Sequence, residues 1–313
     1  MSRPFPRHGV IVALSLPTNR QGRILKRALS THLAWLREIG VHGVLALGST
    51  GEFVRLSPDE RMAALEMIAE LAAPLPVIAN VSDINPRVAA GLARFSRRLG
   101  LPGIAIMPPH FYPVSAADQL AFFLHVAEAA SLPVMLYNFP ELAGNRIDIG
   151  TVDAFAKRAP LTAIKQSGGE FHYLDPLVAL GKKRDFSVFT GSDTRLEEAF
   201  HIGAAGCIGG LVNFVPEYML HIYRGFHEGE PGDFSPAADR MREVGRVMEK
   251  TTFPLNIAAG IEARGFDAGV PKTLVSTESQ RVHAAIIREL KSMFRSWKLP
   301  PPISARNSRS PSP

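Results

Sequence analysis

Eight short apolar runs constrain the fold of this chain more than any other feature of its sequence. They span residues 9–15, 43–48, 76–81, 103–107, 133–137, 161–165, 186–191 and 206–210. Each run is apolar almost throughout and is followed by a stretch with helical periodicity. Strands buried on both faces have this composition, and their alternation with helices indicates a parallel sheet. Eight such units predict a (β/α)8 TIM barrel.

The sequence after the eighth run changes character. After residue 230 the pattern is helical only, over residues 235–250, 254–265 and 278–294. An open, doubly wound sheet is the alternative fold, but the first run lacks the G-x-G-x-x-G that binds dinucleotides. We predict four parts: an N-terminal arm (1–8), the barrel (9–230), a C-terminal helical extension (231–298) and a low-complexity tail (299–313) that is disordered.

The composition excludes several classes of protein. The net charge is +6, but the basic residues are terminal or stand singly or in pairs, without interleaved aromatic residues, so we expect no nucleic-acid binding. The single cysteine, Cys207, excludes an internal disulfide and a cysteine-based metal site, and we predict no metal. No apolar stretch is long enough to cross a membrane, and the first apolar run stops at Pro17. We expect a cytoplasmic protein without membrane contacts.

Barrel enzymes carry their chemistry at the C-terminal ends of the strands, so the residues after each apolar run are candidates. The second run leads into GSTGE, which begins at Gly48. The backbone N–H groups of this turn, with the hydroxyls of Ser49 and Thr50, can hold a carboxylate or a phosphate. An ordinary strand-to-helix turn uses the same glycines, so the motif alone leaves both interpretations open.

Two reactive side chains, a phenol and an amine, stand at the ends of later apolar runs. Tyr137 ends the fifth run and Lys165 ends the sixth. Taken singly, each residue also has a structural interpretation. Tyr137 fits a buried tyrosine with a satisfied hydroxyl, and Lys165 fits an ion-paired or snorkelling lysine. An apolar setting disfavours the charged form of an amine, however, and a neutral lysine is a nucleophile. An anion cradle, a phenol and a desolvated amine on one barrel face together predict Schiff-base chemistry on a 2-oxo acid.

Three motifs in this order resemble the dihydrodipicolinate synthase / N-acetylneuraminate lyase family of pyruvate-dependent class I aldolases. They are GSTGE, YNFP with a glycine four residues after the proline, and IKQSGG. The segment GCIGGLVNFVPE also resembles the eighth-strand segment of this family. The resemblance implies a barrel with a helical extension, no cofactor beyond a covalent Schiff base, and a homo-oligomer built as a dimer of dimers.

The resemblance also implies roles for individual residues. Lys165 would form the Schiff base with pyruvate, and Tyr137 would transfer protons. Ser49 and Thr50, with their backbone amides, would bind the pyruvate carboxylate. The main-chain carbonyl of Ile208 would line the same pocket.

Departures from the family pattern narrow the range of substrates that we expect. Dihydrodipicolinate synthases have an arginine two residues after the YNxP proline, where it binds the carboxylate of aspartate-semialdehyde. This chain has Leu142 there, as lyase-type members do, and an aliphatic side chain cannot replace a bidentate guanidinium. Asp193 and Ser167 match polar contacts of the N-acetylneuraminate lyases, whereas Thr194 and Gly210 replace an acidic residue and a serine. Both aspartate-semialdehyde and sialic acid are therefore disfavoured.

The proton relay of the family includes a second tyrosine, which reaches across the dimer interface from the loop after the fourth strand. The aligned position here is Phe111, which has no hydroxyl, with His110 and Tyr112 beside it. Either Tyr112 takes over through a shifted loop or the relay is incomplete.

These observations predict a Schiff-base lyase or aldolase that joins pyruvate to an aldehyde or cleaves the product. Candidates are aldolases of 2-oxo-3-deoxy sugar acids or 4-hydroxy-2-oxo acids and hydratase-aldolases with aromatic aldehydes. Leu142, Phe139 and Phe111 favour a less polar aldehyde. The alternatives are dihydrodipicolinate synthase, which uses pyruvate and aspartate-semialdehyde, and a catalytically silent barrel that binds 2-oxo acids.

Overall fold

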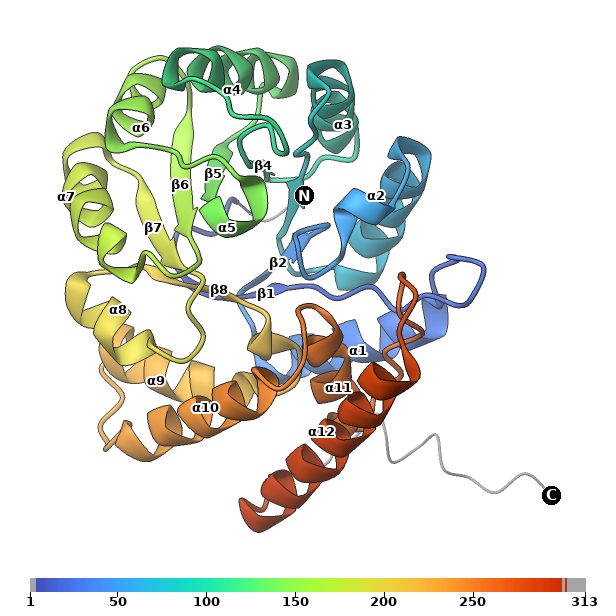
Figure 1. Cartoon of the computed structure of the whole chain (residues 1–313). Coiled ribbons are helices and arrows are strands. Elements are labelled where there is room, and N and C mark those ends of the chain that lie inside the picture. Colours follow the sequence, from blue (N-terminus) through green and yellow to red (C-terminus); the bar gives the residue numbers. More distant parts are fainter. Residues whose placement is uncertain (1–3, 300–301, 303–313) are drawn as a thin grey trace.

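The computed structural model describes residues 4–299 and Pro302, and in this part of the chain eight parallel strands close into one barrel (Figure 1). The strands are β1 (Gly9–Ala13), β2 (Gly43–Ala46), β3 (Val77–Asn80), β4 (Gly103–Ile106), β5 (Val134–Asn138), β6 (Leu161–Gln166), β7 (Ser187–Thr190) and β8 (Gly206–Gly209). Each strand pairs with its neighbours in sequence, and β8 pairs with β1. The predicted (β/α)8 barrel is confirmed.

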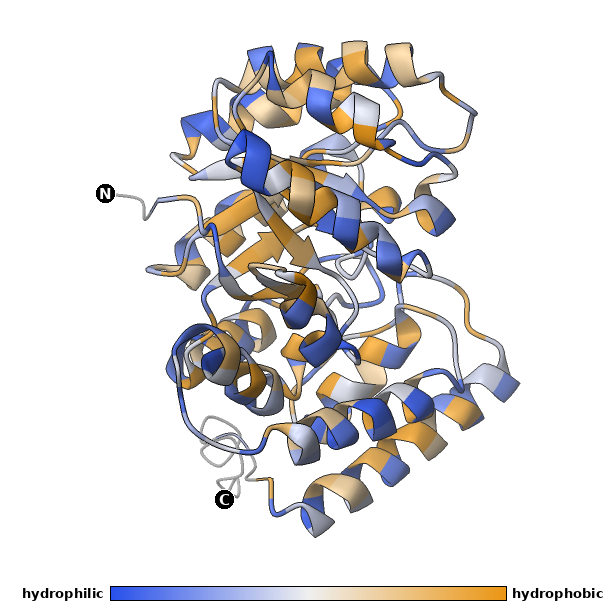
Figure 2. Ribbon diagram, turned by 90° about the vertical axis from the view of Figure 1, so that its left-hand side faces the viewer, coloured by the Kyte–Doolittle hydropathy of each residue, from blue (hydrophilic) through white to orange (hydrophobic). Residues whose placement is uncertain are grey.

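Helices alternate with the strands and surround the barrel. They are α1 (Lys26–Ile39), α2 (Pro58–Ala72), α3 (Pro86–Arg98), α4 (Ala116–Ala130), α5 (Pro140–Ala143), α6 (Ile149–Ala156), α7 (Leu174–Arg184), α8 (Leu196–Ile202) and α9 (Pro216–His227). Figure 2 shows apolar residues filling the strands, while hydrophilic residues occupy outward helix faces. Helix α2 begins with a capping box: the Ser57 hydroxyl accepts the Glu60 N–H, and the Glu60 carboxylate accepts the Ser57 N–H.

Three further helices follow the barrel and lie on one side of it (Figure 1). They are α10 (Ser235–Met248), α11 (Leu255–Arg264) and α12 (Thr277–Ser296). Helix α10 packs on α9, and α11 packs on α12 and on the short 3-10 helix η3 (Leu211–Asn213). The predicted tail lies outside the described residues except for Leu299 and Pro302, as do residues 1–3 of the predicted arm.

A buried asparagine holds the closing seam of the barrel. The amide nitrogen of Asn213 donates to the carbonyl oxygens of Ala13 and Gly210, each at 2.8 Å. Its side-chain oxygen accepts the N–H of Ser15 at 3.1 Å. Asn213 is fully buried, so a lost partner would leave a polar group without water to replace it. This residue therefore fixes the C-terminal ends of β1 and β8 relative to each other.

Candidate active site

Lys165 and Tyr137 are partners across two neighbouring strands. In the register of β5 and β6, Tyr137 lies directly opposite Lys165. Side chains at paired positions of parallel strands point to the same face, so both reach into the barrel. The Lys165 Nζ lies 3.2 Å from the Tyr137 hydroxyl and 4.3 Å from the centre of its ring. Lys165 is only 4% exposed, and Tyr137 is fully buried.

Ser49 extends this pair into a chain of three groups. Its hydroxyl lies 2.9 Å from the Tyr137 hydroxyl, so the phenol contacts both Ser49 and the Lys165 amine. Ser49 stands in the loop that follows β2, inside the predicted GSTGE motif. The structure thus brings together three residues that are far apart in sequence. A phenol that is hydrogen-bonded on both sides can move a proton to and from a group held on the amine.

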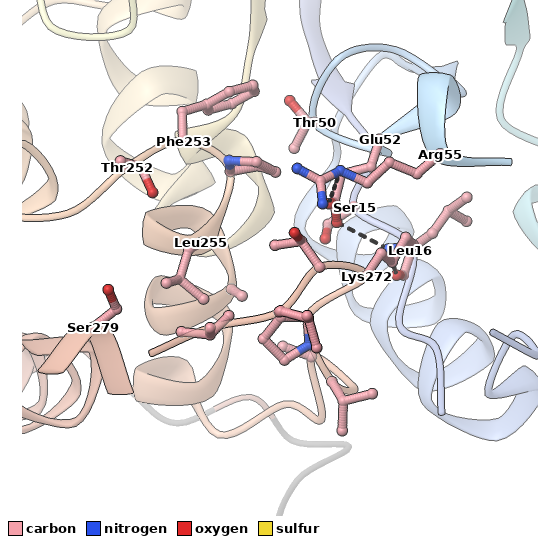
Figure 3. Close-up of a pocket in the computed structure, with 18 of the residues that line it drawn as sticks. Ser15, Leu16, Thr50, Glu52, Arg55, Thr252, Phe253, Leu255, Lys272 and Ser279 are labelled. Atoms are coloured by element: carbon pink, nitrogen blue, oxygen red, sulfur yellow. Dashed lines mark hydrogen bonds and ion pairs between the residues drawn. The ribbon is translucent and has the colours of Figure 1, made fainter. Parts of the chain in front are cut away.

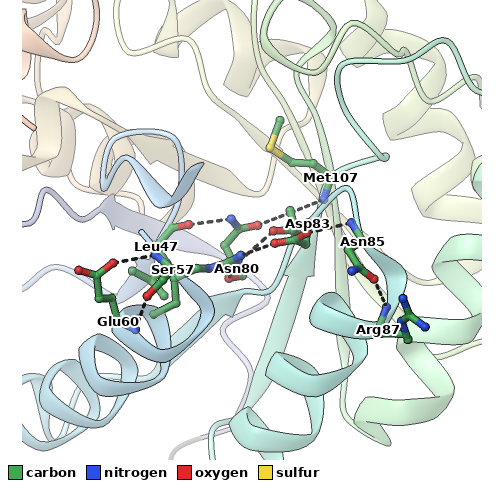
Figure 4. Close-up of polar contacts among 10 residues, drawn as sticks. Leu47, Ser57, Glu60, Asn80, Asp83, Asn85, Arg87 and Met107 are labelled. Atoms are coloured by element: carbon green, nitrogen blue, oxygen red, sulfur yellow. Dashed lines mark hydrogen bonds and ion pairs between the residues drawn. The ribbon is translucent and has the colours of Figure 1, made fainter. Parts of the chain in front are cut away.

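A buried polar network holds the backbone that precedes Ser49 (Figure 4). The Asn80 side-chain N–H donates to the Leu47 carbonyl at 2.6 Å, and the Ser82 hydroxyl donates to the Asn80 oxygen at 2.5 Å. The Met107 N–H in turn donates to the Ser82 hydroxyl at 2.7 Å. Leu47 has φ +57°, a left-handed conformation that costs a leucine roughly 1–2 kcal/mol. The network links the ends of β2, β3 and β4 and fixes this strained turn.

A second set of hydrogen bonds holds the loops after β5 and β6. The Asn138 amide donates to the Gln166 side chain at 2.7 Å, and the Ser167 N–H donates to the Asn138 carbonyl at 2.9 Å. The Glu141 carboxylate accepts the Gly169 N–H at 2.6 Å. Sequence reasoning missed these positioning residues. The signal was present as buried-type polar residues directly after apolar runs, but nothing in the sequence shows their partners.

Ser167 lies against β7 next to the lysine. A Cβ atom added to Gly191 would come within 1.9 Å of the Ser167 hydroxyl oxygen and 3.0 Å of the Lys165 Cε. Gly191 therefore leaves the space that the Lys165 side chain needs. The predicted binding residue Ser167 and the predicted nucleophile thus share one corner of the site.

Asp193 belongs to the same region. Its Oδ2 accepts the Leu211 N–H at 2.9 Å, whereas its Oδ1 is shielded from solvent and has no hydrogen-bond partner among the described residues. A Cβ on Gly209 would lie 1.8 Å from this Oδ1, so the carboxyl group packs directly on β8 beside Ile208. Burial raises the pKa of Asp193 to about 6, with the Leu211 N–H and the Lys165 charge opposing the shift.

Thr50 opens into a cavity of about 310 Å³ between the barrel and the C-terminal extension (Figure 3). The Lys272 Nζ donates to the Leu16 carbonyl at 2.7 Å and pairs with Glu52 at 3.1 Å. Glu52 also pairs with Arg55 at 3.2 Å. Burial lowers the pKa of Lys272, and the Glu52 charge opposes this. The extension therefore contributes a wall of the cavity that Thr50 lines, which sequence reasoning did not anticipate.

The two residues predicted for a relay across the dimer interface lie on the loop between β4 and α4. Phe111 and Tyr112 are 79% and 64% exposed, and their rings meet edge to face with centroids 4.8 Å apart. Phe111 has φ +81°, so the loop tip is strained. Within the described chain, neither residue hydrogen-bonds to Tyr137. Leu142 stands at the mouth of the site, about half exposed.

Comparison with known proteins shows to which family this chain belongs. The model of the dihydrodipicolinate synthetase family matches residues 6–290. The chain belongs to this family. It is 27% identical over 267 residues to an uncharacterized DapA-like lyase of Halobacterium salinarum, covering 85% of this chain and 87% of the relative. It is 26% identical over 285 residues to a 4-hydroxy-tetrahydrodipicolinate synthase of Methanococcoides burtonii, covering 90% and 98%.

Solved structures of the family superpose closely on this one. YagE, a prophage protein of E. coli K12 solved in complex with pyruvate, gives a TM-score of 0.86 at 25% identity, with 94% of this chain and 99% of YagE covered. A sialic acid aldolase of Ruminococcus gnavus has the same fold, with a TM-score of 0.81 at 24% identity and coverage of 92% and 98%. Members of the family are pyruvate-dependent class I aldolases and lyases, and the predicted enzyme class is confirmed.

The described residues contain neither a candidate metal-ion site nor a candidate membrane-spanning helix. Across residues 4–299, no three or more His, Cys, Asp or Glu side chains form a group that could hold a metal ion. None of the helices that the structure describes is both long and apolar enough to span a membrane.

The space at Gly191 yields a first prediction. We expect Gly191→Ala to lower the rate at which pyruvate and borohydride label Lys165 by about 100-fold, because the new methyl group would clash with the Ser167 hydroxyl and crowd the Lys165 Cε, so that the amine loses its position. Mass spectrometry of the intact protein measures this rate. Gly91→Ala, in helix α3 with open space around the Cβ position, is the matched control and should label normally. Normal labelling of Gly191→Ala would contradict the assignment.

The raised pKa of Asp193 yields a second prediction. The folded state holds this proton up to about pH 6, whereas the unfolded chain releases it near pH 4, so the group costs stability as the pH rises between these values. The stability of Asp193→Asn relative to the natural chain should therefore increase by about 2 kcal/mol from pH 4.5 to pH 7.5. Urea unfolding at both pH values measures it. A difference that does not change with pH would show that the carboxyl group titrates normally.

Proposed function

We propose that this protein is a lyase that holds pyruvate as a Schiff base on Lys165 and makes or breaks a bond between it and an aldehyde. The observation that carries the proposal is the hydrogen-bonded chain Ser49–Tyr137–Lys165 at the C-terminal ends of β2, β5 and β6, in which Tyr137 and Lys165 are buried. A buried amine in contact with a phenol is what condensation with a ketone requires. The pyruvate bound in YagE supports the choice of 2-oxo acid.

The Schiff base forms in two steps on these groups. The Lys165 amine adds to the ketone carbon of pyruvate and gives a carbinolamine. Its oxygen leaves as water after gaining a proton, and the Tyr137 hydroxyl, 3.2 Å from the nitrogen, is placed to supply it. Ser49, on the other side of the phenol, can return a proton to Tyr137. General acid–base catalysis of this kind contributes typically 10²–10⁴-fold.

The loop after β2 supplies the carboxylate site. Gly48, Ser49 and Thr50 present backbone N–H groups and two hydroxyls near the amine, and Thr50 is almost fully buried. The carbonyl of Ile208, on β8, faces the same barrel interior in this proposal. An oriented set of N–H and hydroxyl donors stabilises a carboxylate without a full counter-charge.

The iminium then performs the carbon chemistry. Its positive nitrogen draws electrons from the neighbouring carbon, which loses a proton and becomes an enamine nucleophile toward an aldehyde. The reverse sequence cleaves the product. Because the lysine itself supplies the electron sink, we propose that the reaction needs no cofactor. Asp193 and Ser167, which lie beside Lys165, would bind hydroxyl groups of the substrate.

A second candidate is 4-hydroxy-tetrahydrodipicolinate synthase, the name borne by the Methanococcoides burtonii relative. Leu142 argues against it, because the position expected to bind the second carboxylate carries an aliphatic side chain at the mouth of the site. A silent 2-oxo-acid-binding barrel is the third candidate, and the missing hydroxyl at Phe111 is the observation in its favour.

We also propose that copies of this chain assemble into a homo-oligomer, a dimer of dimers, located in the cytoplasm. The exposed aromatic pair Phe111 and Tyr112 at a strained loop tip supports an interface there, because large apolar side chains on a protruding loop are typical of contacts between subunits.

The third prediction tests the Schiff base. The natural chain treated with pyruvate and borohydride should gain the mass of one reduced pyruvate, and Lys165→Ala should gain none. Tyr137→Phe should still form the adduct, but about 100-fold more slowly, because proton transfer loses its catalyst. Lys182→Ala, an exposed lysine on α7, is the control and should label like the natural chain. Labelling of Lys165→Ala to the same extent would sink the proposal.

The fourth prediction distinguishes the proposed lyase from a 4-hydroxy-tetrahydrodipicolinate synthase. With pyruvate and aspartate-semialdehyde, a coupled reductase assay should show turnover near background. Leu142→Arg should raise that turnover at least tenfold, because a guanidinium pairs with the carboxylate of the semialdehyde. Robust turnover by the natural chain would instead make it a dihydrodipicolinate synthase.

A further inference from the structure

A second pocket, of about 190 Å³, borders the site at Ser49. Its wall is mainly apolar and comes from four separate regions: the loop after β2, the end of β4, the loop after β5 and the segment before α11. The apolar lining residues are Phe53, Val54, Met107, Leu142, Phe253 and Pro254. This acceptor pocket is defined by these six residues together with Ser49, Glu52, Arg55 and His110.

The charged side chains that line the pocket are paired with each other. Its charged lining residues, Glu52 and Arg55, pair with each other at 3.2 Å, and Glu52 also pairs with Lys272. Burial lowers the pKa of His110, so its imidazole is neutral at pH 7, and it makes no hydrogen bond within the described residues. A carboxylate or phosphate bound here would compete with Glu52 for Arg55 and would lose its hydration.

The pocket suits a flat ring. The rings of Phe53 and His110 meet edge to face at 86°, with centroids 6.2 Å apart, and Met107 adds a polarizable side chain of the kind that favours aromatic contacts. A cavity of about 150 Å³ lined by apolar side chains is known to hold benzene, so this volume accepts a substituted ring. A polyol chain would instead leave hydroxyl groups unpaired, at about 1–3 kcal/mol each.

One residue, Ser49, connects the pocket to Tyr137 and Lys165. Ser49 lines it, and the Ser49 hydroxyl contacts Tyr137, which contacts the Lys165 amine. An aldehyde whose carbonyl carbon stands beside a pyruvate enamine on Lys165 can therefore place its substituent past Ser49, among the apolar residues.

Resting on the proposed Schiff-base function, we propose that the aldehyde partner is aromatic and that its ring occupies the acceptor pocket. The enamine carbon of Lys165-bound pyruvate forms a bond to the aldehyde carbon, and the aldehyde oxygen takes up a proton. Water then adds to the resulting iminium, and the C–N bond breaks. The products are a 4-aryl-4-hydroxy-2-oxo acid and the free Lys165 amine, with no oxidant or reductant consumed.

The test compares benzaldehyde with glyceraldehyde as partners of pyruvate, with products quantified by chromatography and mass spectrometry. We expect kcat/KM to be about 100-fold higher for benzaldehyde. Leu142→Asn and Met107→Gln nearly conserve side-chain volume, and each should lower kcat/KM for benzaldehyde about tenfold while borohydride labelling with pyruvate alone is unchanged. Ile84→Asn changes an exposed apolar residue outside the pocket and should behave like the natural chain.

The outcomes separate the two proposals. No adduct with pyruvate alone would overturn the Schiff-base function, and this inference with it. A normal adduct with an equal or higher kcat/KM for glyceraldehyde would overturn the aromatic acceptor alone. A benzaldehyde preference that survives both Leu142→Asn and Met107→Gln would overturn the placement of the ring in this pocket.

Discussion

The contact between Lys165 and Tyr137 is the interaction on which the rest of the site depends. An ammonium group enclosed in a barrel is costly unless a partner compensates for lost water, and here the partner is a phenol on the adjacent strand. The parallel register puts the two residues opposite each other, so the contact follows from strand pairing and needs no loop to form it. Ser49 then joins the pair from the loop that follows β2.

The surrounding backbone is held by buried amide and hydroxyl groups. Asn80, Asn138 and Asn213 each bridge two strand ends, and each is fully buried. Bridges of this kind are expensive to break, because a buried polar group that loses its partner costs about 1–3 kcal/mol. Asn80 also holds the turn at Leu47, which has a left-handed conformation two residues before Ser49. The C-terminal face of the barrel is thereby rigid where the chemistry requires it.

The C-terminal extension takes part in the site as well as in the fold. Phe253 and Pro254, which precede α11, line both cavities at the mouth, and Lys272 reaches back to Glu52 of the GSTGE motif. The walls of both cavities are therefore shared between the barrel loops and the extension. The proposed catalytic residues Tyr137 and Lys165 lie on strands, whereas the cavity walls lie mostly on connecting segments, which is where related barrels change their substrates.

The sequence by itself determined the barrel, because eight buried strands must be apolar and must alternate with helices. It also predicted Tyr137 and Lys165 as the candidate pair, because they end their apolar runs and the family motifs surround them. Only the tertiary structure decided that Ser49 touches the phenol, that Lys272 pairs with Glu52, and that Phe53, Met107 and Phe253 share one pocket with Leu142. Periodicity reports which face of an element is buried. Contacts between elements depend on how their loops pack in three dimensions, and a single sequence carries no local signal for that.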